Sequence, residues 1–111
     1  MNHVLLFDDP AFEDYDLQST CRLGRKWFDR LGPGDEVRLE ETGGGQIGTA
    51  EITGVSICPF GRIPVGWASR HHLPEVHTTF DLAEVMKDIY GEDFGRTKPC
   101  TMILFRPDLS R

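Results

Sequence analysis

Basic side chains and hydroxyls gather in residues 19–39, which read STCRLGRKWFDRLGPGDEVRL. The hydroxyls belong to Ser19 and Thr20, and four basic residues precede the turn at 33–35, namely Arg22, Arg25, Lys26 and Arg30. A guanidinium group binds a planar oxyanion through two parallel hydrogen bonds. This segment therefore predicts a local positive surface that binds a phosphate, a carboxylate or a polarised carbonyl oxygen. The alternative is a solvated strand and turn without a ligand.

The overall charge argues against bulk binding of nucleic acid. The 111 residues include 12 basic and 18 acidic side chains, which gives a net charge of −6. An acidic protein repels the phosphate backbone at long range, so we expect no extended contact with DNA. A small polar ligand or one local RNA contact is compatible with this charge.

A second group of polar side chains follows in the segment HHLPEVH. It contains His71, His72, Glu75 and His77. Imidazoles and a carboxylate suit zinc, but Pro74 interrupts the spacing and no cysteine is near, so we expect neither a metal nor another cofactor. A histidine here, His72 among the candidates, is instead expected to hydrogen-bond Glu75 or a ligand base.

Three aromatic residues flank expected loops and are candidates to stack on a nucleobase. They are Trp27, Phe60 and Trp67. Aromatic platforms of this kind are common in sites for single-stranded nucleic acid. Trp27 is equally suited to anchor the core, so Trp67, in a glycine- and proline-rich segment, is the preferred candidate for an exposed platform.

The cysteines and the hydropathy pattern indicate the cellular compartment. Cys21, Cys58 and Cys100 are odd in number and widely spaced, which disfavours a disulfide framework or a zinc knuckle and favours reduced thiols. The short apolar run near the start is followed by acids, and no later run reaches the length of a bilayer span. We therefore expect a cytoplasmic protein without a membrane segment.

Hydrophobic periodicity predicts β-structure in the first half of the chain. Residues 4–7 and 19–23 are expected strands, and Val37 and Leu39 alternate with charged residues, as in a strand with one wet face. In the strand after the glycines at 43–45, the alternation slips by one residue at Gly54. Such a slip predicts a β-bulge and a bend.

A change of period predicts a helix late in the chain. Apolar residues within 82–90 recur at helical spacing, Thr78 with Asp81 fits a capping box, and Gly91 fits a C-terminal stop. The apolar run 101–105 then predicts a central strand.

Together these elements predict the α+β class, mainly β, as one domain over residues 1–111. A small sheet of four or five strands exposes its edges unless it curls. We therefore expect a curved sheet or open barrel with helices across one end.

The order of these signals resembles the ASCH domain family of the PUA-like superfamily. The matching pieces are Thr20-x-Arg22, Gly34-Asp35, AEITGV, HHLPEVH, a helix ending in DIYG and the strand TMILF. The resemblance implies a small PUA-like open β-barrel with one or two flanking helices, and recognition of RNA or a nucleoside. One bacterial branch of the family hydrolyses the acetyl amide of acetylated cytidine nucleosides, with a lysine, a threonine and a glutamate around the cleft.

Carried over by position, the resemblance assigns the threonine to Thr20 and the glutamate to Glu75. The family lysine falls on Leu17, so Lys26 or Arg25 would have to replace it. In an amidohydrolase, Thr20 is the candidate nucleophile, Glu75 the base, and Arg22 the group that stabilises the oxyanion.

Three hypotheses therefore stay open. The leading one is a module that binds RNA or a nucleoside through Arg22, Glu75 and the loop from Phe60 to His77. The second is an amidohydrolase acting on an acylated cytidine nucleoside through Thr20 and Glu75. The third, if neither ligand nor reaction is found, is a protein-interaction adaptor.

Overall fold

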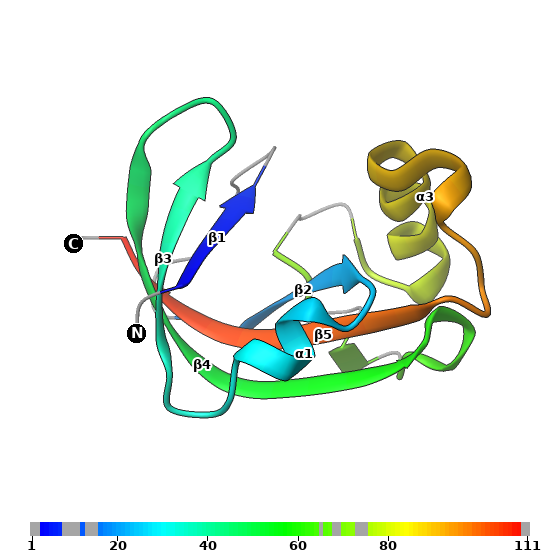
Figure 1. Cartoon of the computed structure of the whole chain (residues 1–111), viewed down its shortest axis with the longest axis horizontal. Coiled ribbons are helices and arrows are strands. Elements are labelled where there is room, and N and C mark those ends of the chain that lie inside the picture. The colour runs from blue at the N-terminus through cyan, green and yellow to red at the C-terminus, as the bar shows by residue number, and fades with distance from the viewer. Residues whose placement is uncertain are drawn as a thin grey trace.

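A computed structural model of the chain describes residues 3–7, 12, 16–64, 66–67, 70–72 and 76–109. Its five strands form one sheet in the order β1-β3-β4-β5-β2 (Figure 1). The strands are β1 His3–Phe7, β2 Gln18–Leu23, β3 Glu36–Glu41, β4 Gln46–Pro59 and β5 Pro99–Asp108. β1 runs parallel to β3, and the other neighbours are antiparallel.

Within the described residues, helices α1 and α3 and the 3₁₀ turns η1 and η2 accompany the sheet. They are α1 Lys26–Arg30, η1 Phe60–Arg62, α3 Thr79–Tyr90 and η2 Gly91–Asp93. α1 is not predicted by the sequence, because it is five residues long and no side chain caps its start. Within the described residues, no helix combines the length and apolar character needed to cross a membrane.

The sheet curls into a half-barrel, which confirms the prediction of a mainly β, open-barrel fold. β4 and β5 are its longest strands and curve across the molecule (Figure 1). The predicted bulge is present: Ile52 pairs with Phe105 and Gly54 with Leu104, so Thr53 is the inserted residue. Such an insertion bends a strand and increases its twist. β1 and β2 are the outer strands, and the barrel therefore stays open between them.

Alternate residues of β5 contribute to two apolar clusters. Ile103 and Phe105 pack into a cluster with Leu5, Leu39 and Ile52 from β1, β3 and β4. Cys100 and Met102 belong to a second cluster, which contains residues of α3, η1 and β2. This alternation is the period of a strand covered on both faces, so the apolar run 101–105 forms the central strand that it predicts.

α3 begins and ends at the predicted residues. The Thr78 hydroxyl accepts the Asp81 amide at 3.1 Å, and the Asp81 carboxylate accepts the Thr78 amide at 3.2 Å, which completes the capping box. Gly91 follows with a φ of 58°, a conformation that a side chain disfavours. The apolar face is not wholly buried, however, because Ile89 keeps 52% of its surface exposed.

Candidate functional site

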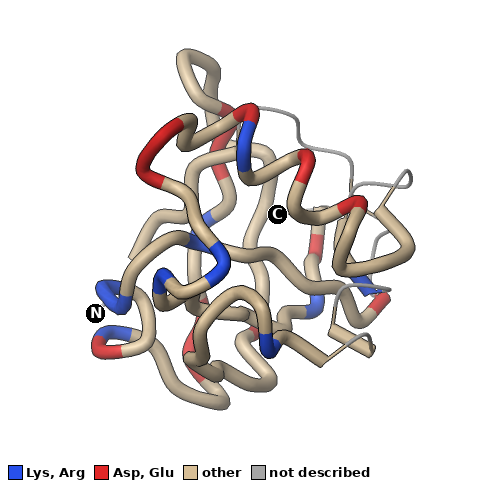
Figure 2. The backbone as a smooth tube through the Cα atoms, turned by 90° about the vertical axis from the view of Figure 1, so that its right-hand side faces the viewer, with Lys and Arg blue, Asp and Glu red and all other residues tan. Residues whose placement is uncertain are grey.

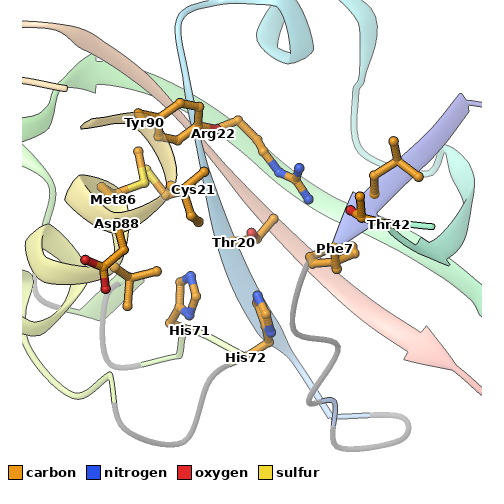
Figure 3. A pocket seen from close by; sticks show the side chains of 13 residues that line it. Phe7, Thr20, Cys21, Arg22, Thr42, His71, His72, Met86, Asp88 and Tyr90 are labelled. Atoms are coloured by element: carbon orange, nitrogen blue, oxygen red, sulfur yellow. The ribbon is translucent and has the colours of Figure 1, made fainter. Parts of the chain in front are cut away.

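A cavity of about 350 Å³ lies where the half-barrel stays open. Both outer strands contribute to its wall, β1 through Leu6 and Phe7 and β2 through its middle residues. The C-terminal half of α3 and residues 71–72 complete it, together with Thr42 (Figure 3). We call this opening between β1 and β2 the seam.

The outer edge of β2 is partly covered by residues 70–72. Ser19 donates its amide to Arg70 O at 2.8 Å, and His72 donates its amide to Ser19 O at 3.0 Å. The Ser19 hydroxyl also donates to the Trp67 carbonyl at 2.6 Å. These bonds hold His71 and His72 beside the cavity.

Arg22 is the cation of the seam. Its side chain extends from β2 towards Phe7 and Thr42 (Figure 3). The guanidinium carbon lies 4.6 Å from the centre of the Phe7 ring, within the range of a cation–π contact. Phe7 is in turn packed edge-on by Phe12 and His72, with ring centres 4.9 and 5.0 Å away. The contacts fix the orientation of a positive, planar donor group in the cavity wall.

His71 is buried beside this cation. Burial first, and the charge of Arg22 second, lower its pKa from 6.5 to about 4. At neutral pH its ring is therefore uncharged, with one nitrogen that donates and one that accepts hydrogen bonds. The ring stacks on His72 with centres 4.5 Å apart. The wall of the cavity thus combines flat ring faces with neutral polar edges.

The side facing α3 is mostly apolar but carries one acid, Asp88 (Figure 3). Val85, Met86 and Tyr90 line it, and the Tyr90 hydroxyl accepts the Leu23 amide at 3.3 Å. Cys21 lies there too, but its hydrogen bond with Cys100 and its burial raise the pKa of its thiol well above the usual range. The Cys21 thiol therefore stays protonated and is a poor nucleophile at neutral pH.

The structure brings together three of the residues that the sequence singles out for binding. Thr20, Arg22 and His72 all line the cavity. Lys26 lines an adjoining cavity that shares Arg22 with the first. Glu75 lies outside the described residues.

Two other predicted site residues lie elsewhere. Arg25 is exposed and lines neither cavity; its guanidinium pairs with Asp29 at 3.1 Å. Trp67 is partly buried against the apolar cluster under α3, so it is not the exposed platform that the sequence suggests. Trp27 lines the adjoining cavity.

Sequence reasoning missed Phe7, Thr42 and Tyr90 as cavity residues. The alternation of side chains along β1 places Phe7 on the same face as the buried Leu5. The approach of β1 to β2, however, depends on the tertiary fold, and no local sequence pattern predicts it. Among the described residues, no group of three His, Cys, Asp or Glu side chains is placed to hold a metal ion.

Solved structures share this architecture. An ASCH domain from Lactobacillus crispatus JV V101 superposes with a TM-score of 0.64 at 16% identity, over 81% of this chain and 63% of that one. The chain has an ASCH-like fold. Protein EF3133 of Enterococcus faecalis V583, from family DUF984, superposes with a TM-score of 0.57 at 14% identity, over 81% of this chain and 62% of that one. The hypothetical protein PH0355 matches with a TM-score of 0.70 at 17% identity, over 96% of this chain and 99% of that one.

These likenesses are structural. No family model matches the sequence, and no curated protein matches it. The chain spans less than two thirds of the length of the first two structures. At these identities the ASCH-like fold is what the comparisons establish.

Proposed function

We propose that the seam binds a nucleoside, either free or as one residue of an RNA. The observation that carries this proposal is the Arg22 guanidinium held 4.6 Å from the Phe7 ring in the wall of a cavity of about 350 Å³. A nucleobase presents a hydrogen-bonding edge and a flat apolar face, and proteins recognise unpaired bases through both.

The described wall offers groups for each part of such a ligand. Arg22 is a fixed donor, and Thr20 and His72 can each donate or accept. Phe7, His72 and Tyr90 provide rings against which a base or sugar can pack. The volume lies at the lower end of the range for small-molecule sites, which suits one nucleoside rather than a larger ligand.

The charge distribution supports local recognition. Basic and acidic residues are interleaved along the backbone in the view of Figure 2. With a net charge of −6, the protein has little long-range attraction for RNA. Affinity would therefore come from contacts inside the seam.

Titration calorimetry with adenosine, guanosine, cytidine and uridine tests this proposal. Replacement Arg22→Ala removes a charged donor and is expected to weaken binding on the order of tenfold or more. Arg25→Ala is the matched control, because it removes an exposed arginine three positions away that lines neither cavity. Circular dichroism verifies the folding of both variants. Absence of binding by all four nucleosides, or equal binding by the Arg22→Ala variant, would refute the proposal.

Amide hydrolysis of an acylated cytidine is a second candidate, favoured by the presence of the Thr20 hydroxyl and the Arg22 guanidinium in one cavity. Thr20 Oγ1 would attack the acyl carbonyl, Arg22 would stabilise the oxyanion, and the cytidine nitrogen would leave with a proton. Water would then release the acid from the threonine ester.

Acetate release from acetylcytidine separates this candidate from simple binding. An enzyme is expected to lose the activity in the Thr20→Val variant, which keeps the shape of the side chain and removes the hydroxyl. Binding of a nucleoside without acetate release supports a binding module that is not an amidohydrolase. If neither binding nor release occurs, a protein-interaction adaptor becomes the preferred function.

A further inference from the structure

A second cavity of about 400 Å³ adjoins the seam, between β1 and α1. Arg22 and Leu6 line both cavities, so the two spaces share a wall. The second cavity is also lined by Lys26 and Arg30 of α1. Among the described residues, every charged side chain in its lining is basic, although the whole chain carries a net charge of −6.

The short helix α1 separates its charges by face. Lys26 and Arg30 are four residues apart and therefore lie on one side of the helix. Asp29, the acid of α1, is bound instead by Arg25, whose Nε and Nη2 contact both carboxylate oxygens at 3.1–3.4 Å. Within the described part of the chain, neither Lys26 nor Arg30 forms an ion pair with an acid. Their charges thus remain available to an anion from outside.

Trp27 provides a rigid neighbour for these cations. The Lys26 ammonium lies 5.2 Å from the centre of the Trp27 ring, and the His3 ring packs edge-on against it at 5.9 Å. A cation held over a ring loses less freedom when it binds an anion. The second cavity therefore combines three positive groups with an aromatic wall, which suits a phosphate group attached to an organic ligand.

We propose that the second cavity binds a phosphate joined to the sugar of the nucleoside in the seam. This inference rests on the proposed function, and it specifies the ligand as a phosphorylated nucleoside rather than a free one. Arg22 links the two parts, because the same side chain borders the space for the ring and the space for the anion. The phosphate can belong to a mononucleotide or to the backbone of an RNA strand.

Calorimetry with the four nucleosides, their 5′- and 3′-monophosphates and four-residue RNA homopolymers tests this inference. At least one phosphorylated form is expected to bind on the order of tenfold more tightly than its nucleoside. The double variant Lys26→Ala/Arg30→Ala is expected to lose this gain and to keep the affinity for the nucleoside. The control Arg62→Ala/Lys98→Ala removes one exposed arginine and one exposed lysine that line neither cavity, and it is expected to retain the gain.

Salt dependence gives an independent measurement. The logarithm of the association constant for the phosphorylated ligand should fall with the logarithm of the salt concentration, and the slope should flatten in the Lys26/Arg30 double variant but not in the control. An equal salt dependence of the association constant in the natural protein, the double variant and the control would mean that the phosphate binds elsewhere, and it would overturn the inference.

The remaining outcomes separate this inference from the proposed function. Equal affinity for nucleosides and their phosphates would overturn the phosphate site and leave nucleoside binding intact. No binding by any of the compounds would overturn both. Tighter binding by the tetranucleotides than by the monophosphates identifies an RNA strand as the source of the phosphate, and equal binding identifies a mononucleotide.

Discussion

The apolar cluster of β1, β3, β4 and β5 and the seam between β1 and β2 are built from neighbouring strands but from different kinds of residue. In the cluster, Leu5, Leu39, Ile52, Ile103 and Phe105 are all fully buried. The seam instead contains Arg22, Asp88 and the two histidines. The inward-facing side chains of these strands pack against one another away from water, so they can all be apolar. Outer strands that do not meet leave a space in which polar side chains retain contact with water.

Because of this difference, we expect the apolar cluster to determine mainly the stability of the fold and the seam to determine mainly ligand recognition. Burial of apolar side chains is the main favourable term in folding, and the cluster supplies much of it. Residues of the seam add less, because a buried polar ring such as His71 loses hydration when the chain folds. We therefore expect mutations in the two regions to have opposite consequences for the free energy of unfolding and for ligand affinity.

The largest expected effect on stability comes from Ile52→Ala. The residue is completely buried next to the bulge of β4, so its truncation should lower the free energy of unfolding by about 2–5 kcal/mol. Nucleoside affinity of the folded fraction should change less than twofold, because Ile52 does not line the seam. Urea unfolding followed by circular dichroism gives the first quantity and calorimetry the second.

Arg22→Ala should show the reverse: a small change in unfolding free energy and a large loss of affinity. The comparison between the two regions breaks down if Ile52→Ala lowers affinity as much as Arg22→Ala does, or if Arg22→Ala is the more destabilising variant.

The elements of the apolar cluster were the easier part to predict from sequence. Alternation within strands identifies Val37 and Leu39 as inward-facing, and the slip at Gly54 identifies the bulge, because both signals lie within a few residues. The capping box of Thr78 and Asp81 is equally local. Such features depend on the period of the backbone and require no knowledge of the partner strand.

The seam was only partly predictable, because it depends on contacts between distant segments. The spacing of two places Thr20 and Arg22 on one side of β2, as the sequence suggests. Which basic residue accompanies them depends on α1, whose five residues direct Lys26 to the second cavity and Arg25 to Asp29. Without a capping signal for this short helix, sequence alone does not separate Lys26 from Arg25.

The free energy of unfolding, measured as a function of pH, should reveal the contribution of His71, a residue of the seam. The native ring keeps its neutral form until its pKa of about 4, whereas the unfolded chain binds a proton below about 6.5. The unfolded state therefore binds more protons between these values, and the free energy of unfolding should fall as the pH is lowered from 6.5 to 4. The decrease in unfolding free energy due to His71 should reach about 3 kcal/mol and should level off below pH 4.

Urea unfolding at a series of pH values measures this contribution as the difference between the natural protein and a His71→Gln variant. The variant should show a shallower decline over the same interval, even if it is less stable at every pH. Parallel curves for the two proteins would show that His71 is not kept neutral by its surroundings.

The smallest expected effect is that of Thr78→Ala at the start of α3. This helix joins the second apolar cluster to the seam, since Leu82 is fully buried in that cluster while Tyr90, near the other end of the helix, lines the seam. Loss of the capping hydroxyl leaves the Asp81 amide without its acceptor and should lower the free energy of unfolding by about 1 kcal/mol. Nucleoside affinity should remain within twofold, because the cap lies at the end of the helix away from Tyr90 and Ile89.

The charge on Asp81 provides the check on this interpretation. Its carboxylate accepts the His77 and Thr78 amides, and these bonds lower the pKa of the group below its usual value. The stabilisation from the ionised carboxylate is therefore present above the unfolded pKa and is lost as the pH falls through the lower, folded one. An Asp81→Asn variant should lose this acid-dependent contribution. If Thr78→Ala instead weakens nucleoside binding as strongly as Arg22→Ala, then the first turn of α3 contributes to the geometry of the seam, and the proposed separation between the supporting core and the binding edge does not extend to this helix.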